Sequence, residues 1–476
     1  MAAGTPVWSS RFAFIMASVG FAVGLGNIWR FPYVTGENGG GAFVLVYLLF
    51  VLAIGVPCVM AELMVGRRGQ SSPSQSMAKV AGESGLSRFW GGVGGLGVFT
   101  AYTISITYAV VVGWVLWYLI QAVMTGFAGY DAAAATSSFN SLLADGSTML
   151  VMTILGNLIV GSIIYAGVTG GIERAVTFMM PLLFALLIGL GIYNMFAGGF
   201  GETVRWLFTP DFSKIDGSVL LAALGQAFFS IGVGMGGMMA YGSYLPANFS
   251  ITRGAMVIVL ADTLVALLAG FVVFPMVFNY GLDMGGGAGL IFQTLPVAFA
   301  QMPGGHIFAV LFFVMLSVAG VTSMVGLLEA VTSWTDQRTT LGREMSAVVV
   351  VGSVTFCSIA SVFSYNVWQD YTLFGMNFNA ASEGLYDKIT LPLGGLLIAL
   401  FVGWFMKREF AFSELATSEQ TFGVWQLLLK FVVVPAIAII LITDGGLSLF
   451  KLRLFTLGKP ASIMPPGAAV RDGSGG

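Results

Sequence analysis

The chain has 476 residues, of which 57% are hydrophobic and only 9% are charged, and its mean hydropathy is +0.90. These values lie far outside the range of soluble domains and indicate a polytopic membrane protein. A formal net charge of -2 leaves no basic excess of the kind that nucleic-acid partners require. Cys58 and Cys357 lie in apolar runs without a CxxC motif or a Cys/His cluster, so nothing here indicates a structural metal.

Apolar runs long enough to cross about 30 Å of hydrocarbon follow one another along almost the whole chain. We expect an all-α polytopic membrane protein with eleven transmembrane helices in one domain over residues 11–443. Residues 1–10 form a short N-terminal segment, and residues 444–476 form a C-terminal tail. The expected spans cover 11–36, 41–66, 88–124, 148–168, 174–198, 220–245, 254–280, 305–336, 343–364, 384–406 and 422–443.

Lys and Arg in the loops set the expected orientation. A cytoplasmic N-terminus places most of them on the cytoplasmic side, namely Arg67, Arg68, Lys79, Arg88, Arg174, Arg253, Arg338, Arg343, Lys407 and Arg408. The C-terminal tail is the exception, because eleven spans place its basic residues outside. Either the tail is a tolerated exception, or the segment 447–457 lies in the membrane interface or partly re-enters. We expect a multi-pass protein of the inner (plasma) membrane.

The first span is interrupted by residues that lipid does not tolerate. Gly24 and Gly26 weaken the helix, and Asn27, Arg30 and Pro32 follow in the same span. Irregular backbone and an ionisable residue at membrane depth occur where protein or a cavity covers them. The segment therefore indicates a binding site near the middle of the membrane.

A second interrupted span lies five spans later, between Phe228 and Pro246, with glycines at 232, 234, 236 and 237. Because equivalent spans are five apart, which is an odd number, they would cross the membrane in opposite directions. Spans 1–5 (about 11–198) and spans 6–10 (about 220–406) would therefore form a five-plus-five inverted repeat. Paired broken helices in corresponding places are typical of the central site of a secondary transporter. The alternative is that these glycines only allow helices to pack closely.

Unwound helices expose carbonyl groups that coordinate cations and N–H groups that hold anions. A small zwitterion satisfies both kinds of group at once. Asp262 is a bare carboxylate in the apolar span 7, and its burial without a partner is costly enough to imply a cation or a proton. Thr322 and Ser323 in span 8 offer hydroxyls that either ligate an ion or bond to their own helix.

Three motifs together resemble the neurotransmitter:sodium symporters, also called solute carrier family six. They are FAVGLGNIWRFPYVTGENGGGAFVLVYL in span 1, the segment from Gln226 to Gly237, and AGVTS in span 8. The similarity extends from Trp8 to about Ile442 and includes the bacterial amino acid transporters of that family. It implies sodium-coupled import of an amino acid or amine by alternating access, with two sodium ions and no organic cofactor.

The resemblance also implies the ligands. The first sodium would bind Ala22, Asn27, Ser230, Asp262 and the substrate carboxylate, and the second Gly20, Val23, Ala319, Thr322 and Ser323. The substrate carboxylate would meet the N–H groups of Leu25 and Gly26 and the hydroxyl of Tyr108, and its ammonium the carbonyls of Ala22, Phe229 and Ser230. The side-chain pocket would be lined by Ile104, Tyr108, Phe229, Gly232, Met235, Ser323, Gly326 and Leu327.

Gly24 stands where monoamine carriers of the family have an acid, which favours a substrate that brings its own carboxylate. A pocket of apolar side chains, glycines and a flexible methionine favours a hydrophobic or aromatic L-amino acid. The alternative is that the small residues only pack helices and leave the pocket small.

Chloride dependence in the family rests on a cluster of Tyr, Gln and hydroxyl groups. Tyr47, Gln226 and Ser230 match this cluster, but Ala266 replaces the hydroxyl of span 7 and Asp262 adds a fixed carboxylate. Because a carboxylate beside the sodium makes an anion unnecessary and repels it, we expect chloride-independent transport.

The outer gate of the family is matched by Arg30 and Asp387, which would close over Tyr108 and Phe229. This pair would separate the site from the extracellular side.

The inner gate departs from the family pattern. Trp8 matches, but Thr5 replaces the usual basic residue, for which Arg11 would substitute. The acidic partner would be Asp336, one position earlier than usual. Glu62 would accept hydrogen bonds from the opened backbone of span 6.

Two other functions fit the same residues. A proton-coupled amino acid carrier of the same fold would use Asp262 as a titrating group, and a receptor or sensor would bind the amino acid without transporting it. An enzyme is disfavoured, because no set of nucleophile, base and orienting residue is apparent. Besides the substrate and the bilayer, the sequence indicates no nucleic acid and no obligate protein partner.

Overall fold

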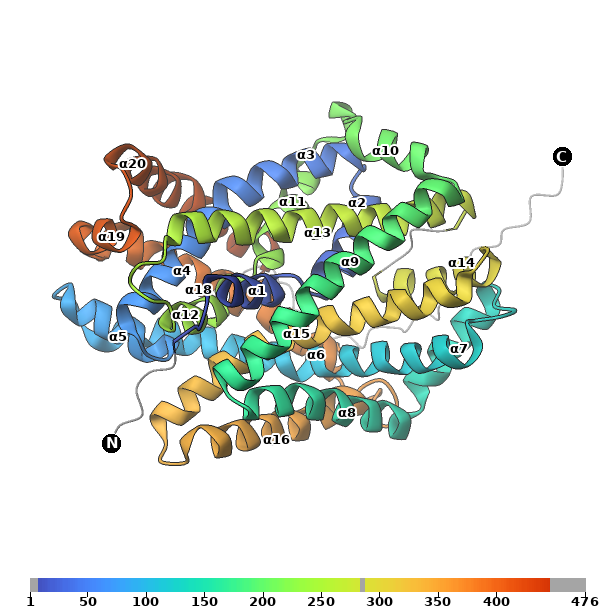
Figure 1. Ribbon diagram of the computed structural model, residues 1–476, viewed down its shortest axis with the longest axis horizontal. Helices are drawn as coiled ribbons and strands as arrows, with labels where there is room; N and C mark the ends of the chain where they lie inside the picture. Colours follow the sequence, from blue (N-terminus) through green and yellow to red (C-terminus); the bar gives the residue numbers. More distant parts are fainter. Residues whose placement is uncertain (1–6, 283–286, 446–476) are drawn as a thin grey trace, which may run out of the picture.

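A computed structural model describes residues 7–282 and 287–445, and both stretches are helical almost throughout (Figure 1). The helices are α1 Arg11–Ala22, α2 Phe31–Glu37, α3 Gly41–Phe50, α4 Val56–Gly69, α5 Pro73–Glu83, α6 Gly91–Thr125, α7 Ala132–Ala144, α8 Gly146–Tyr165, α9 Arg174–Ala197, α10 Phe200–Phe208, α11 Gly217–Ser230, α12 Gly237–Ser243, α13 Ile251–Asn279, α14 Leu295–Gln301, α15 Gly305–Arg338, α16 Gly342–Phe363, α17 Phe378–Leu385, α18 Leu391–Leu400, α19 Arg408–Leu415, α20 Glu419–Leu428 and α21 Val434–Ile440. Within the described residues, the only extended pairing is an isolated bridge between Leu373 and Met376. The all-α class is therefore confirmed for this part of the chain.

Nine continuous helices in the described part are long and apolar enough to cross a membrane, and some run through short π-helical turns. They are Gly41–Gly69, Arg88–Thr125, Gly146–Tyr165, Val168–Ala197, Ile251–Asn279, Gly305–Arg338, Gly342–Phe363, Phe378–Phe405 and Glu419–Thr443. A tenth span is the pair Arg11–Ala22 and Gly26–Glu37, which meet at an angle of 51°. The span expected over 220–245 consists of two separate helices, α11 and α12, each too short to cross alone.

Both interruptions have a local cause in the backbone. Between α11 and α12, Gly232, Gly234 and Gly236 have φ angles of 70°, 88° and 75°, which glycine adopts readily and other residues rarely do. In span 1, Val23 leaves the helical region with φ -72° and ψ 101°, and helical structure resumes at Gly26. Each break leaves carbonyl and N–H groups without partners in their own helix.

The two longest helices, α6 and α15, lie side by side through the molecule and are flanked by α8 and α16 (Figure 1). On the other side, α1 packs against α9, α13 and α15, and α12 packs against α4. The Phe21 side chain of the first break lies against Gly232 of the second. The two breaks therefore face each other in the interior of the bundle.

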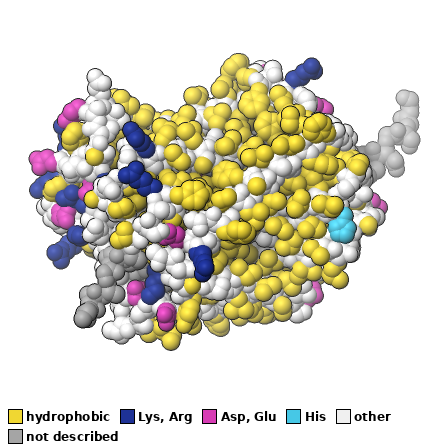
Figure 2. All heavy atoms as spheres, in the orientation of Figure 1, with side chains coloured by type: hydrophobic (Ala, Val, Ile, Leu, Met, Phe, Trp, Pro, Cys, Tyr) yellow, Lys and Arg dark blue, Asp and Glu magenta, His cyan; other side chains and the backbone are white. Residues whose placement is uncertain are grey.

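The face of the molecule seen in Figure 2 is apolar over a wide band and charged mainly at one end. Figure 2 shows Lys, Arg, Asp and Glu side chains gathered at the end that carries α5, α19 and α20 in the view of Figure 1. Large apolar side chains such as Leu158, Phe178 and Phe431 are exposed on the long helices, as lipid-facing residues are. The expected C-terminal tail lies, from residue 446 onward, outside the described residues.

Candidate functional site

The break in span 1 opens the backbone beside two hydroxyl groups. The N–H of Gly24 donates to Oδ1 of Asn27 at 3.1 Å, and the N–H of Leu25 donates to the hydroxyl of Tyr108 at 3.2 Å. A Cβ added to Gly24 would lie 2.6 Å from Oγ of Ser323 and 3.0 Å from the Tyr108 hydroxyl. A side chain at position 24 would therefore have to displace the Ser323 hydroxyl, and a ligand there meets backbone and hydroxyl groups.

A carboxylate is buried beside this break among neutral groups. The Nδ2 group of Asn27 donates to Oδ1 of Asp262 at 2.8 Å and to Oγ of Ser230 at 3.0 Å, and Oγ of Ser230 donates to Oδ2 of Asp262 at 2.7 Å. Asn27 and Asp262 are fully buried, and Ser230 is 3% exposed. Amide and hydroxyl donors do not neutralise a buried carboxylate, so this oxygen cluster favours a cation or a proton.

A second group of oxygens connects span 1 to α15. Oγ of Ser323 donates to the carbonyl of Gly20 at 3.2 Å and to that of Val23 at 3.0 Å. The hydroxyl of Thr322 bonds within its own helix, to the carbonyls of Val318 at 2.9 Å and Ala319 at 3.2 Å. The structure thus brings together all five residues expected around the second sodium, with carbonyl and hydroxyl oxygens that suit a hard cation.

The pocket expected for the substrate side chain contains a residue that the sequence analysis missed. A Cβ added to Gly326, Gly237 or Gly232 would lie 2.3, 2.4 or 3.1 Å from the Phe21 side chain. The Phe21 ring therefore occupies the space that these glycines leave. Its signal in the sequence is a large aromatic residue next to a glycine-rich break.

The remaining pocket residues are divided between the interior and a cavity. Ile104, Met235 and Leu327 are buried at 4%, 6% and 3% exposure, and Ala22 at 6%. Gly26 lies close to the Phe229 ring, because an added Cβ would be 3.1 Å from its Cε1 atom.

A cavity of about 300 Å³ reaches the first break and the Phe229 ring. It is lined by Leu25, Gly26, Trp29, Arg30, Tyr33, Thr107, Tyr108, Val111, Phe229, Gly287, Glu383, Tyr386 and Asp387. Nη1 of Arg30 lies 3.3 Å from Oδ1 of Asp387, and the guanidinium lies 4.3 Å from the centre of the Phe229 ring. The structure therefore brings the expected outer-gate residues together over Phe229, and Trp29, Glu383 and Tyr386 are cavity residues that the sequence analysis missed.

The opposite end of the site is closed by aromatic packing. Trp8 is 4% exposed, and its Nε1 donates to the carbonyl of Tyr241 at 3.0 Å. The Trp8 ring packs edge-on against Tyr241 and Tyr244, with ring centres 5.4 and 6.1 Å apart. Ser9 donates to the carboxylate of Glu173, which connects the start of α1 to the turn before α9.

An acid that the sequence analysis did not name forms the ion pair at this end. Glu329 is fully buried and binds Arg343 at 2.5 Å and the hydroxyl of Tyr244 at 2.6 Å, whereas Asp336 has no ion pair within the described residues. Asp336 lies in the last turn of α15, nearer the solvent, while Glu329 lies two turns deeper. Arg11 only reaches the carbonyl of Asn248 at 3.5 Å, and Thr5 lies outside the described residues.

Two further expectations concern the surroundings of the breaks. Oε1 of Glu62 accepts the N–H of Gly234 at 2.6 Å, which confirms the expected support of the opened backbone. Nε2 of Gln226 donates to the carbonyl of Gly26 at 3.3 Å. The Tyr47 hydroxyl and Oε1 of Gln226 are buried without a hydrogen-bond partner among the described residues, and Ala266 is fully buried.

Two opposed broken helices, oxygen clusters around a buried carboxylate and closures at both ends define a membrane transporter for a solute and a cation. Comparison with known proteins identifies the family. A model of the "Sodium:neurotransmitter symporter family" matches residues 5–140 and 134–451. The chain belongs to this family and is a sodium-dependent membrane transporter.

Individual relatives agree with this assignment. The sodium-dependent transporter YhdH of Bacillus subtilis is 33% identical over 93% of this chain and 98% of its own, and one from Haemophilus influenzae is 32% identical over 92% and 97%. The sodium-dependent dopamine transporter of Bos taurus is 28% identical over 89% of this chain and 67% of its own. Among solved structures, MhsT in complex with L-phenylalanine matches with 38% identity and a TM-score of 0.85, over 92% of this chain and 99% of that one.

Proposed function

We propose that this protein imports a hydrophobic or aromatic L-amino acid together with sodium, by alternating access and without chloride. The observation that carries the proposal is the fully buried Asp262 carboxylate, whose side-chain partners among the described residues are the neutral donors Asn27 and Ser230. A carboxylate in this setting calls for a positive partner. A sodium ion that touches both Asp262 and the substrate carboxylate would make the binding of ion and substrate mutually dependent.

The proposed roles of the other residues follow from the same arrangement. The first sodium binds Ala22, Asn27, Ser230 and Asp262, and the second binds Gly20, Val23, Ala319, Thr322 and Ser323. The substrate carboxylate binds the N–H groups of Leu25 and Gly26 and the Tyr108 hydroxyl. Its side chain lies among Ile104, Phe229, Met235 and Leu327, and Phe21 limits how far it extends. Close packing at Gly24 supports this assignment, because an acidic side chain there would have to displace the Ser323 hydroxyl.

The amino acid class is inferred from the walls of the site. The pocket residues are apolar or aromatic, and the structurally similar MhsT is described in complex with L-phenylalanine. We propose eleven spans in this protein, with α11 and α12 acting as one interrupted span, the N-terminus in the cytoplasm and the chain in the plasma membrane. Arg30 and Asp387 form the outer gate, and Trp8 belongs to the inner one.

One binding experiment tests the substrate class. Purified protein is assayed for sodium-dependent binding of each of the twenty amino acids. We expect the strongest binding among Leu, Met, Phe, Tyr and Trp. Binding of glycine without a response to Leu or Trp would contradict the proposed pocket.

Chloride independence has a separate test. At constant sodium, uptake into proteoliposomes should be unchanged when gluconate replaces chloride, because Asp262 supplies the negative charge beside the ion. A collapse of uptake in gluconate would refute this part of the proposal.

A proton-coupled carrier is the second candidate, because a proton on Asp262 would also satisfy its neutral surroundings. An imposed sodium gradient at fixed pH drives uptake only in a sodium-coupled symporter. A receptor without turnover would bind the amino acid and show no flux in the same vesicles.

A further inference from the structure

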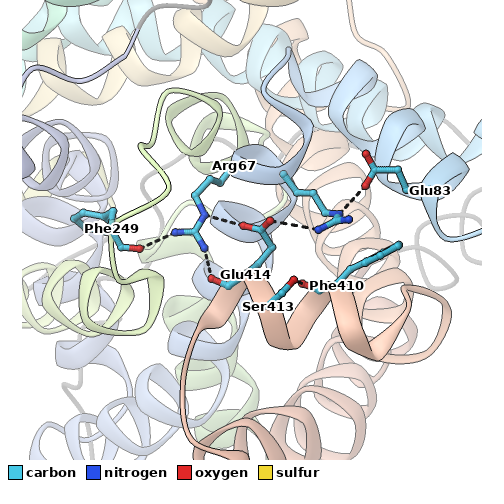
Figure 3. Close-up of polar contacts among 7 residues, drawn as sticks. Arg67, Glu83, Phe249, Phe410, Ser413 and Glu414 are labelled. Carbon is cyan, nitrogen blue, oxygen red and sulfur yellow. Dashed lines mark hydrogen bonds and ion pairs between the residues drawn. The ribbon is translucent and has the colours of Figure 1, made fainter.

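Four charged side chains form a cluster at the charged end of the molecule, outside the proposed binding site. They are Arg67 and Arg68 at the end of α4, Glu83 at the end of α5 and Glu414 in α19, and we call them the arginine latch (Figure 3). Together they connect α4 with α5, with α19 and with the loop between α12 and α13. Neither the binding of ions nor that of the substrate requires such a cluster.

Arg67 is the buried centre of the arginine latch. Its side chain is 7% exposed, and Nε donates to Oε2 of Glu414 at 2.8 Å. Nη1 donates to the carbonyl of Phe249 at 2.6 Å, and Nη2 donates to the backbone carbonyl of Glu414 (Figure 3). A guanidinium with three fixed acceptors holds their relative positions, and loss of its carboxylate partner leaves a charge buried without compensation.

Arg68 extends the same cluster toward α5. Its Nε donates to Oε2 of Glu83 at 2.6 Å, and its Nη1 donates to Oε1 of Glu414 at 3.4 Å. The guanidinium also lies 3.8 Å from the centre of the Phe410 ring in α19. Glu414 therefore binds one arginine with each carboxylate oxygen, and this holds α19 against α4.

The carbonyl that Arg67 holds belongs to a residue in contact with the broken span. The ring centre of Phe249 lies 4.8 Å from that of Phe14 in α1, and Phe14 lies 6.1 Å from Trp8. Trp8 in turn covers Tyr241. The arginine latch thus positions the surface on which the first half of span 1 rests when this end is closed.

We propose that the arginine latch holds the Trp8 end of the pathway closed, and that weakening it shifts the transporter toward the conformation open at that end. The inference rests on the alternating access proposed above, in which α1 must separate from Phe249 for the solute to leave. The latch residues act through loop position and touch neither ion nor substrate. Removing an interaction that exists in only one of two conformations shifts the equilibrium toward the other.

The test measures access to both ends of the pathway. The reference protein carries Cys58→Ala and Cys357→Ala, together with one reporter cysteine. The inner reporter is Ser18→Cys in α1, at a position that is fully buried here and whose hydroxyl has no partner among the described residues. The outer reporter is Val111→Cys, at a position that lines the same cavity as Arg30 and Asp387.

Each reporter protein is reconstituted in sodium and treated with a water-soluble maleimide. With Glu414→Gln, we expect the inner reporter to react about tenfold faster and the outer reporter to react more slowly, because the same population shift exposes one and covers the other. General loosening of the fold would accelerate both. Opposite changes at the two ends therefore separate a positioning role from a merely structural one.

A matched control lies next to the same short helix, at the start of α20. Glu419 pairs with Arg408 of α19 at 2.7 Å, but both side chains are more than half exposed, at 65% and 59%. Glu419→Gln should leave both labelling rates at the reference values. Equal acceleration of the inner reporter by Glu419→Gln and Glu414→Gln would overturn the proposal.

A milder variant guards against misfolding of Glu414→Gln. Glu83→Gln removes one partner of Arg68 and leaves the buried Arg67 pair intact. Like Glu414→Gln, it should accelerate labelling of the inner reporter and slow labelling of the outer one, but by smaller factors. The proposal would be refuted if Glu83→Gln and a folded Glu414→Gln protein both showed the labelling rates of the reference protein at the two reporters. The effect of sodium on the labelling rates of the reference protein tests the proposed sodium coupling. The ratio of the labelling rates of variant and reference protein tests the role of the arginine latch.

Discussion

The two ends of the proposed pathway are closed by different kinds of contact. At the cavity end, Arg30 and Asp387 form one ion pair, and their side chains are 33% and 34% exposed. At the other end, Trp8 packs between Tyr241 and Tyr244, and the fully buried Glu329 binds Arg343. An ion pair that is one-third exposed contributes little free energy, whereas a buried charge without its partner is strongly destabilising. The structure thus has one weakly held end and one strongly held end.

This difference indicates that the structure is closed at the Trp8 end and is reached by a cavity at the Arg30 end. A cavity of about 300 Å³ reaches the residues of the first break from the Arg30 end. At the Trp8 end, aromatic rings and a buried ion pair fill the equivalent space. Opening the cavity end requires the separation of one pair, and opening the other end requires the separation of a packed layer.

Glu329→Ala should have the largest effect on this contrast. It leaves the partly buried Arg343 and the Tyr244 hydroxyl without their acceptor, at a cost to the closed state of about 3 kcal/mol. We expect the sodium concentration for half-maximal uptake to rise by about a hundredfold, because closure at this end becomes unfavourable. The exposed neighbour Glu344→Ala is the control and should behave as the wild type. Equal sodium dependence in all three proteins would contradict the strong closure at this end.

Phe21→Ala should come next, because it removes a buried ring between the two breaks. The free volume beside Gly232, Gly237 and Gly326 would grow, and the cost in stability is about 3 kcal/mol. We expect competition binding to shift by about tenfold in favour of Trp over Leu, since a larger side chain fills the new space. An unchanged order of amino acids would show that the ring lies outside the substrate pocket.

Trp8→Phe should produce an intermediate change at the strongly held end. It keeps an aromatic ring against Tyr241 but removes the Nε1 hydrogen bond, which contributes about 1 kcal/mol. A rise of about fivefold in the half-maximal sodium concentration is expected in the uptake assay. An effect as large as that of Glu329→Ala would mean that this hydrogen bond, and not the buried ion pair, dominates closure.

Asp387→Asn should have the smallest effect, because the pair it breaks is about one-third exposed and therefore screened by water. Its contribution is below about 1 kcal/mol, so we expect the rate of substrate uptake to change by less than about fivefold. Flux at saturating sodium measures this directly. Complete loss of uptake in a folded Asp387→Asn protein would remove the contrast between the two ends.

Features that depend on local chemistry were predictable from the sequence. Glycines and a proline within apolar runs marked both breaks, since they act on the helix that contains them. Asp262 stood out because a lone carboxylate in an apolar span needs a partner wherever the span packs. The contact of Glu62 with Gly234 followed from the resemblance to the family.

Features that depend on packing between distant spans were not predictable. In a sequence, a glycine is compatible with either an open pocket or close packing between helices. At Gly232, Gly237 and Gly326, the position of the Phe21 ring decides between the two. Glu329 and Asp336 lie in the same helix, and their depth relative to Arg343 is set by how α15 and α16 pack. The arginine latch joins residues more than 300 positions apart, such as Arg67 and Glu414, and no local pattern signals it.

The central claim is that Asp262 binds the sodium ion that drives uptake. Proteoliposomes with wild-type protein or Asp262→Asn are given an imposed sodium gradient at equal pH on both sides, and accumulation of radiolabelled L-phenylalanine is followed. The account predicts sodium-driven accumulation by the wild type and none by a folded Asp262→Asn protein at the same sodium concentration. Accumulation that follows a proton gradient without sodium, or sodium-driven accumulation that survives Asp262→Asn, would contradict it.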